Sequence, residues 1–387
     1  MIPYGRQEII EEDIREVEKI LRSDFLTQGP TVPRFEQSVA DYCSASYAIA
    51  MNSATSALHI ACLALDLGPG DCLWTSANTF VASANCGLYC GADVDFVDID
   101  PKTYNMSVQA LSEKLIRSEK LGKLPKILVP VHFAGQPCDM VEIHKLSKKY
   151  GFKIIEDASH AIGASYDKIK VGSCNHSDIT IFSFHPVKII TTAEGGMALT
   201  NNLDIANKIF RLRTHGIDYD KTKFQEIPKD MICNYQQVEL GFNYRMNDIQ
   251  ATLGLNQMKR LDKYIERRHE IALRYDEELK NLPIIMPFQS KKVYSSYHLY
   301  PMCIKHDEIK KSQKEIFSNL RENDIGVNLH YMPVYLHPYY QFLKFKEGYC
   351  SNAEAYFKST ISIPIFSSLT NENQTKVIKT ITKIINE

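Results

Sequence analysis

Residues 152–161 read FKIIEDASHA, and this stretch indicates the fold class of the chain. Its apolar, β-branched first half is typical of a strand that is buried on both faces of a sheet. The strand delivers Glu156 and Asp157 to its carboxyl end. A buried carboxylate without a partner is costly, so Asp157 is expected to meet a positive charge that the neighbouring sequence does not supply. The alternative is that Asp157 caps a helix, while His160 could hydrogen-bond Asp157 or cover a ligand.

Short apolar runs of the same kind recur on both sides of this strand and alternate with amphipathic stretches. Strands that alternate with helices predict an α/β fold, with a mostly parallel sheet covered on both faces. Residues 53–65 and 139–150 have helical patterns, and Gly151 suits the C-terminal cap of the second. The expected strands are Tyr47–Met51, Asp71–Thr75, Asp93–Val97, Lys126–Val131, Phe152–Glu156, Ile179–Phe184 and Gly196–Thr200.

The sequence changes character after about residue 245, and 387 residues are too many for one compact unit. We expect residues 1–250 to form a large domain that includes the N-terminal segment. Residues 251–387 are expected to form a connecting helix and a small C-terminal α+β domain. Asp248–Leu279 carries an apolar stripe that predicts one long helix or two in succession. Later elements are expected at Tyr297–Cys303, Ser312–Asn323, Gly326–Tyr331 and Asn371–Ile385.

Composition and charge disfavour several classes of function. Lys and Arg number 45 against 46 Asp and Glu, and the net charge of −1 argues against a nucleic-acid partner. No apolar run reaches the roughly 20 residues needed to cross a bilayer. The N-terminus lacks a signal-peptide core, so we expect a cytoplasmic protein that does not bind membranes. The ten cysteines are scattered without a CxxC pair, which indicates reduced thiols and no metal site.

The segment Asn52-Ser53-Ala54-Thr55-Ser56 lies between an expected strand and an expected helix. Small hydroxyl residues at a helix start leave backbone N–H groups free to hold an anion, which the helix dipole favours by about 0.3–1 kcal/mol. The alternative is a plain N-cap by Ser53 or Thr55. Ser183, at the end of another strand, could add a hydroxyl to the same anion site.

The segment SFHPVKIITTAEGG, residues 183–196, places Lys188 among few polar neighbours and before a Gly-Gly turn. Such a lysine either extends to solvent or is kept as a reactive amine. A free lysine has a pKa near 10.4, so chemistry on a carbonyl at neutral pH requires burial or nearby positive charge to lower that pKa. Because Asp157 and Lys188 both follow strands of one sheet, both can reach the same cleft.

Together these groups predict a site for pyridoxal 5'-phosphate. Its phosphate needs amides and hydroxyls, its pyridine nitrogen needs a carboxylate, and its aldehyde needs an amine. The flat ring also needs an apolar cover, for which Phe80 in the loop 76–80 is the candidate. The alternative for Phe80 is an ordinary place in the hydrophobic core.

Five motifs, found together and in this order, resemble those of a known family. The chain is similar to the fold-type I, pyridoxal-phosphate-dependent aminotransferases of nucleotide-linked keto sugars, the DegT/DnrJ/StrS type, and most of all to those of pseudaminic acid synthesis. The resemblance implies a seven-stranded, mostly parallel sheet in the large domain and a smaller C-terminal α+β domain. The motifs are NSATSAL (52–58), EDASHA (156–161), SFHPVKIITTAEGG (183–196), GFNYRM (241–246) and HYMPVY (330–335).

By this resemblance, Lys188 holds the cofactor covalently and moves protons, and Asp157 is the partner of the pyridine nitrogen. His160 stands where many relatives have glutamine and is expected to contact the ring. Asn243 corresponds to a residue that reaches the phosphate from the partner subunit, which implies a homodimer with shared active sites. The cofactor-binding residues implied are Ala54, Thr55, Phe80, Asp157, His160, Ser183, Lys188 and Asn243.

For the substrates, the resemblance implies transfer of an amino group from L-glutamate to C4 of a UDP-linked 4-keto-6-deoxy-N-acetyl-hexosamine, with 2-oxoglutarate as the other product. Arg245 is the candidate for binding the carboxylate of glutamate, and its alternative is a structural ion pair. The residues expected to contact substrates are Tyr4, Asp24, Phe25, Leu26, Thr27, Ala54, Ser183, Asn243, Arg245, His330 and Tyr331.

Other functions stay open at this point. The sugar could be GDP-4-keto-6-deoxymannose, a UDP-4-keto-pentose or a 3-keto sugar. A dehydratase of the same fold is disfavoured, because those relatives have histidine where this chain has Lys188. A non-catalytic regulator that binds the cofactor or a sugar would usually carry a DNA-reading domain, and no basic helix-turn-helix segment is evident. A nicotinamide enzyme is disfavoured because no GxGxxG follows the first strands.

Overall fold

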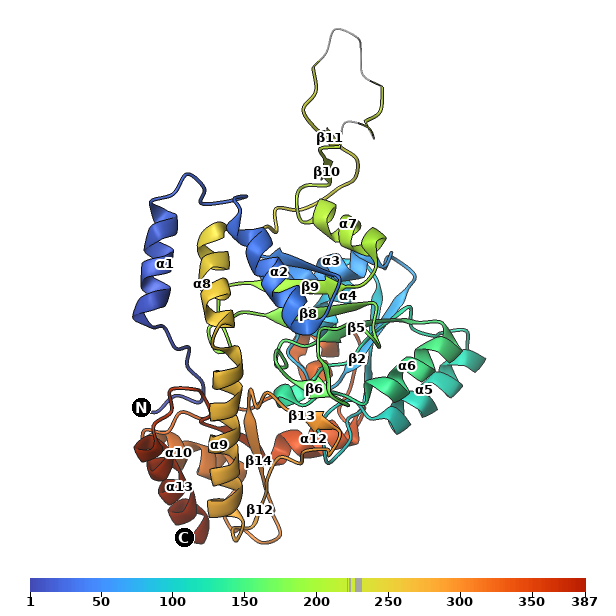
Figure 1. Cartoon of the computed structure of the whole chain (residues 1–387). Helices are drawn as coiled ribbons and strands as arrows, with labels where there is room; N and C mark the ends of the chain where they lie inside the picture. The colour runs from blue at the N-terminus through green and yellow to red at the C-terminus, as the bar shows by residue number, and fades with distance from the viewer. Residues whose placement is uncertain (221, 223, 227–231) are drawn as a thin grey trace.

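The computed structural model describes residues 1–220, 222, 224–226 and 232–387. Its centre is a seven-stranded sheet with the order β1-β9-β8-β5-β4-β2-β3 (Figure 1). Neighbouring strands pair in parallel, except that β9 runs antiparallel to both β1 and β8. All seven predicted strands are present, which confirms the expected α/β class. Their bounds are β1 Tyr47–Met51, β2 Cys72–Ser76, β3 Asp93–Val97, β4 Ile127–Val129, β5 Lys153–Asp157, β8 Ile179–Ser183 and β9 Gly196–Thr200.

Helices cover both faces of this sheet because both faces of its strands are apolar. Ile155 and Ile181 lie in a hydrophobic cluster with α3, α4 and α7 on one face. On the other face, Ile154 packs with α5 and α6, and Phe182 packs with α2 and α8. The helices are α2 Thr31–Cys43, α3 Ala54–Ala64, α4 Ala82–Tyr89, α5 Val108–Lys120, α6 Met140–Tyr150, α7 Leu203–Leu212 and α8 Asp248–Met258.

The expected long helix after residue 248 is two helices in succession, α8 and then α9, Leu261–Leu279. They form the column that leads from the large sheet to the smaller domain in Figure 1. The N-terminal helix α1, Glu11–Leu21, lies beside α8 and is tied to its end. Asp13 accepts two hydrogen bonds from Arg260 Nη2, at 2.8 and 2.7 Å, and one from Asn256 at 2.7 Å.

The smaller domain has a three-stranded antiparallel sheet of order β12-β14-β15. The predicted segment Gly326–Tyr331 does not form a regular strand, and only Asn328 pairs with Ser362 of β15 as an isolated bridge. Ile2 pairs with Ile325 and lies in the same core, so the start of the chain packs on this domain. The division at residue 250 stays a prediction. The elements are β12 Ile284–Ile285, β14 Tyr300–Ile304, α10 Gln313–Glu322, α11 Pro338–Phe342, α12 Ser351–Ser359, β15 Thr360–Ile363 and α13 Asn371–Asn386.

Short elements complete the described chain. The pair β10–β11 projects from the rest of the chain at the top of Figure 1. Among the residues that the structure describes, no helix is long and apolar enough to span a membrane. The same residues contain no cluster of three metal-ligating side chains, and the ten cysteines are free thiols. The short strands are β6 Ser165–Tyr166, β7 Ile169–Lys170, β10 Ile217–Asp218, β11 Gln236–Gln237 and β13 Val293–Tyr294, and the 3-10 turns are Phe133–Gly135 and Val334–Leu336.

Candidate active site

Four strand ends come together at one edge of the large sheet. Asp157 ends β5, and Ser183 ends β8 beside it. Ser183 pairs with Gly196 at the start of β9, and Gly196 pairs in turn with Met51 at the end of β1. The start of α3, Asp157 and the loop that carries Lys188 therefore share this edge, as the sequence predicted.

The start of α3 can hold an anion. Ser53 is the N-cap, since its Oγ accepts a hydrogen bond from Ser56 N at 3.1 Å. The plain-cap alternative is thus correct for Ser53, but it leaves the amides of Ala54 and Thr55 without partners inside the helix. Ser183 Oγ receives only a long contact, 3.5 Å, from the amide of His185. These amides and the hydroxyl fit a phosphate group.

Gly196 allows β9 to pass close beneath the start of α3. A methyl group at Gly196 would overlap the backbone of Ser53 and Ala54. Gly196→Ala is therefore expected to destabilise the protein by about 1–3 kcal/mol and to weaken cofactor binding, because the backbone of the cradle must shift. Gly68→Ala is the matched control, since nothing lies within 4 Å of an added Cβ there. Urea denaturation of the cofactor-free proteins measures the first effect and fluorescence titration with pyridoxal phosphate the second; equal results for both variants would contradict the prediction.

Asp157 is held by hydrogen-bond donors, and the expected cationic partner is not found, since no ion pair joins Asp157 to any residue that the structure describes. Its Oδ2 accepts from Ser83 Oγ at 2.6 Å, and its Oδ1 accepts from Ser159 N at 3.1 Å. A turn follows Asp157, so it does not cap a helix. Ser83 is fully buried on α4 and also bonds Thr79 at 2.7 Å. The sequence analysis missed Ser83, whose only signal was its position three residues after Phe80.

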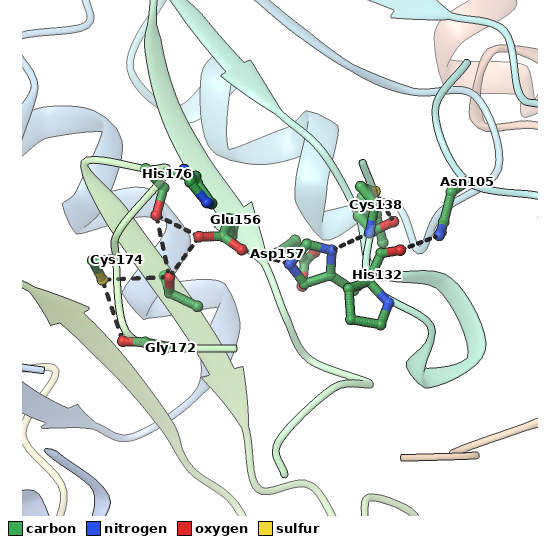
Figure 2. A network of polar contacts seen from close by, with 12 residues as sticks. Asn105, His132, Cys138, Glu156, Asp157, Gly172, Cys174 and His176 are labelled. Atoms are coloured by element: carbon green, nitrogen blue, oxygen red, sulfur yellow. Dashed lines mark hydrogen bonds and ion pairs between the residues drawn. The ribbon is translucent and has the colours of Figure 1, made fainter. Parts of the chain in front are cut away.

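Glu156, the neighbour of Asp157, belongs to a separate buried network shown in Figure 2. Its Oε2 lies 2.7 Å from His132 Nε2, and its Oε1 accepts from Ser177 and Thr180. His132 Nδ1 accepts from Cys138 N at 3.1 Å, so His132 carries its proton on Nε2 and donates to Glu156. His132 N also donates to the carbonyl of Asp157 at 3.1 Å. The network therefore fixes the backbone from which Asp157 projects.

Glu156 is expected to stabilise the fold in a pH-dependent way. Burial raises its pKa, but the hydrogen bonds from His132, Ser177 and Thr180 outweigh burial, so the pKa of Glu156 is lowered. Its contribution is present above the ordinary value of about 4.3 and is lost as the pH falls through the lowered folded value. Glu156→Gln should cost about 1.5–3 kcal/mol at pH 7, since hydrogen bonds to a charged group are lost. In urea unfolding across pH, the difference from the wild type should shrink below about pH 4; a constant difference would contradict this assignment.

Lys188 lies in the loop between β8 and β9 and is partly buried. Its amide donates to His185 O at 2.9 Å, which forms a tight turn at this point. Burial lowers the pKa of Lys188 to about 8, and the charge of Asp157 opposes that shift. About a tenth of the amine is therefore uncharged at pH 7, against less than a thousandth for a free lysine, and covalent chemistry on a carbonyl requires this uncharged form.

The amine of Lys188 should titrate at a lower pH than an ordinary lysine. Competitive labelling of the cofactor-free protein, read by mass spectrometry, should give a midpoint near pH 8 for Lys188. A model lysine peptide labelled in parallel titrates at about 10.4. Equal midpoints for the peptide and for Lys188 would show that burial does not free this amine.

Aromatic side chains form walls beside this lysine, whose charge adds to burial in lowering the pKa of two of them, His160 and His330. The rings of Tyr4 and His330 lie 5.3 Å apart, and those of Phe80 and Tyr331 lie 6.4 Å apart. Phe80 is 58% exposed, so it is not a core residue and its face is free to cover a ligand. A Cβ added at Gly5, next to Tyr4, would lie 3.9 Å from Val187 of the lysine loop. The N-terminal segment thus reaches the site, as the resemblance implied for Tyr4.

Two histidines of the walls have both ring nitrogens in use. His330 faces Ser362 Oγ at 2.9 Å and Asn328 Nδ2 at 3.2 Å. Burial, with a smaller contribution from Lys188, lowers the pKa of His330 to about 3, so the ring is neutral. His160 is also buried and bonds Ala134 and Tyr331. His298 packs on His160 with ring centroids 4.3 Å apart, and the sequence analysis did not single it out.

Other predicted residues are not brought into this cluster within one chain. The side chains from Asp24 to Thr27 are exposed in the loop between α1 and α2, and Asn243 is also exposed. Arg245 pairs through its backbone with Met51 at the end of β1. Its Nε is buried without a hydrogen-bond partner, and no ion pair joins Arg245 to any residue the structure describes. The alternative of a structural ion pair for Arg245 is therefore not observed in this part of the chain.

The assembled groups fit pyridoxal phosphate. An amine of lowered pKa, a carboxylate held by two donors, a helix start with free amides and an exposed aromatic face lie at one edge of the sheet. Each matches one demand of the cofactor: the aldehyde, the pyridine nitrogen, the phosphate and the flat ring.

The model of the DegT/DnrJ/EryC1/StrS aminotransferase family matches residues 7–382. The chain belongs to this family. It is a sugar aminotransferase of the nucleotide-sugar type, and it uses pyridoxal phosphate. The fold class, the enzyme class and the cofactor predicted from the sequence are thus confirmed.

Relatives of this aminotransferase match it over nearly its whole length. A UDP-4-amino-4,6-dideoxy-N-acetyl-beta-L-altrosamine transaminase of Campylobacter jejuni is 39% identical over 381 residues, covering 98% of this chain and 96% of that protein. The structure of Helicobacter pylori PseC, an aminotransferase involved in the biosynthesis of pseudoaminic acid, has a TM-score of 0.88 at 31% identity and covers 100% of this chain and 99% of that one. The pyridoxal-phosphate form of Spr1654, a putative sugar aminotransferase of Streptococcus pneumoniae, has a TM-score of 0.87 at 28% identity, with 100% and 98% covered.

Proposed function

We propose that this aminotransferase moves the amino group of L-glutamate to C4 of a UDP-linked 4-keto-6-deoxy-N-acetyl-hexosamine, as in pseudaminic acid synthesis. The observation that carries the proposal is the cluster of Lys188, Asp157 and the start of α3 in a chain 39% identical to an N-acetyl-altrosamine transaminase. That relative is named for a nucleotide sugar with an amino group at the same carbon, which supports this sugar class.

We assign the cofactor contacts as follows. Lys188 binds the cofactor through its amine, and Asp157 holds the pyridine nitrogen. Phe80 and His160 cover the ring, and the phosphate lies against Ala54, Thr55 and Ser183, with Asn243 reaching it from the partner subunit. This last contact makes the active enzyme a homodimer with shared sites.

Bound pyridoxal phosphate supplies an electron sink for the carbon that loses its proton. The amine of Lys188 removes that proton from the amino donor and later returns a proton to C4 of the sugar. One base over one face of a flat ring meets both demands, provided its position is fixed. The tight turn at His185 restricts where Lys188 can move.

The substrates are proposed to lie against the aromatic walls. Tyr4, His330 and Tyr331 contact the nucleotide sugar, together with the loop from Asp24 to Thr27. Arg245 binds a carboxylate of glutamate, and its buried Nε without a partner supports this role. A guanidinium can bind a carboxylate through two parallel hydrogen bonds.

One experiment tests the sugar and the donor together. The purified enzyme is incubated with pyridoxal phosphate, L-glutamate and a panel of UDP- and GDP-linked keto sugars, and the aminated product is identified by NMR. The proposal expects amination at C4 of the UDP-4-keto-6-deoxy-N-acetyl-hexosamine. Preference for GDP-4-keto-6-deoxymannose, a UDP-4-keto-pentose or a 3-keto sugar would replace this substrate by another, and binding without turnover would favour a regulator. The cytoplasmic location stays a prediction.

A further inference from the structure

The hydrogen bonds of His160 have a defined direction. Nδ1 accepts from the backbone N–H of Ala134 at 3.3 Å, and Nε2 lies 3.2 Å from the hydroxyl oxygen of Tyr331. An accepting ring nitrogen carries no proton, so the one proton of neutral His160 lies on Nε2. His160 therefore donates to Tyr331, and the hydroxyl proton of Tyr331 must point elsewhere.

The neighbours of His160 keep it neutral. Burial, Lys188 and His330 hold the pKa of His160 well below its ordinary value. His298 packs on the ring of His160, and burial, with nearby Lys188 and Arg268 among the further causes, holds the pKa of His298 well below its ordinary value. Ser296 Oγ donates to the carbonyl of His160 at 2.7 Å and fixes the backbone of the residue.

Tyr331 is held as a hydrogen-bond donor. Its amide donates to Asn78 Oδ1 at 3.0 Å, which fixes its backbone beside the loop after β2. Burial raises the pKa of Tyr331, and the nearby Tyr4 and Asp157 raise it further, so the phenol keeps its proton. Among the residues that the structure describes, His160 is the one hydrogen-bond partner of this hydroxyl.

We propose that His160 is a positioning residue, which fixes the hydroxyl of Tyr331 as a hydrogen-bond donor to an oxygen acceptor of the ligand held at Lys188. This inference rests on the proposed function, since it assumes that the cofactor and the keto sugar meet beside Lys188. The acceptor is an oxygen of the sugar or the phenolic oxygen attached to the pyridine ring of the cofactor. His160 offers the ligand only its ring face, because both of its nitrogens are used.

Kinetics of the two half-reactions distinguish these acceptors. Tyr331→Phe should slow the sugar half-reaction alone by roughly 10- to 100-fold if the acceptor is on the sugar, and both half-reactions if it is on the cofactor. His160→Leu should slow the same half-reactions by a similar factor. The double variant should be no slower than Tyr331→Phe. His160→Gln should recover most of the rate, because an amide can accept from Ala134 N and donate to Tyr331. Tyr42→Phe is the matched control, since its hydroxyl bonds Asp262 at 2.6 Å, outside the site.

A second measurement does not depend on turnover. Nitrogen NMR of the histidine side chains in the cofactor-free protein should show His160 with its proton on Nε2 across neutral pH. A proton on Nδ1, unchanged rates in Tyr331→Phe, or losses that multiply in the double variant would each overturn the proposal. If the wild type aminates no keto sugar, the proposed substrate is wrong, while the tautomer and the glutamate half-reaction still decide the role of His160.

Discussion

Lys188→Ala should abolish turnover, with a loss of at least about 10³-fold in kcat, because the variant lacks both the amine that binds the cofactor and the base that moves the proton. The same variant should no longer give a peptide that carries reduced cofactor after borohydride treatment. Mass spectrometry of the digested protein measures the second effect, and steady-state kinetics with glutamate and the keto sugar measures the loss in kcat.

Two controls make this result specific to the amine. Lys145→Ala removes an exposed lysine of α6 that pairs with Glu142 at 2.6 Å, and it should leave activity unchanged. Lys188→Arg keeps a positive charge but offers no amine, and it should be as inactive as the alanine variant. Normal turnover by either Lys188 variant would remove this residue from the reaction.

Asp157→Asn should slow both half-reactions by on the order of 10²- to 10³-fold, because a neutral amide cannot hold a proton on the pyridine nitrogen. The substitution keeps the size of the side chain, and the amide oxygen can still accept from Ser83 or Ser159. Folding should therefore survive, and circular dichroism and urea unfolding check that it does. Unchanged rates would mean that another group holds this nitrogen.

Two further variants separate the effect of the charge of Asp157 from the effect of the groups that hold Asp157 in place. Ser83→Ala removes the donor at 2.6 Å but keeps the carboxylate, so it should slow the enzyme by only about tenfold. Glu156→Gln alters the adjacent carboxylate, which belongs to the His132 network, and it should lower stability more than rate. Equal losses of rate in all three variants would indicate that the edge of the sheet had been disturbed as a whole.

The fold could be predicted because each strand of the large sheet is recognisable from its own residues. Buried parallel strands are short apolar runs, and each of the seven predicted runs is a strand. The meeting of Asp157, Ser183 and the start of α3 followed from that arrangement, since the carboxyl ends of parallel strands share an edge. Gly326–Tyr331 was expected among the elements of the small domain, but only one bridge at Asn328 forms there.

The parts that could not be predicted depend on contacts between distant segments. Ser83 reaches Asp157 across 74 residues, and neither position reveals the other. His298 follows a polar Ser-Ser-Tyr stretch far along the chain, and only the packing of the two domains brings it to His160. Asn243 stays exposed in the single chain, and a role for it at the cofactor follows only from the proposed homodimer.

The antiparallel direction of β9 restricts how this enzyme can change in length. The chain leaves the sheet after Ser183 and returns to it at Gly196 on the same edge, so both stems of the intervening loop are fixed by strand pairing. An inserted residue could be absorbed in the exposed turn at Gly151 between α6 and β5, at the other end of β5 from Asp157. Inserted beside Lys188, it would have to bulge into the space kept for the ligand or force the register of two strands to slip. Natural variants of this enzyme should therefore accept substitutions in the loop far more readily than insertions or deletions.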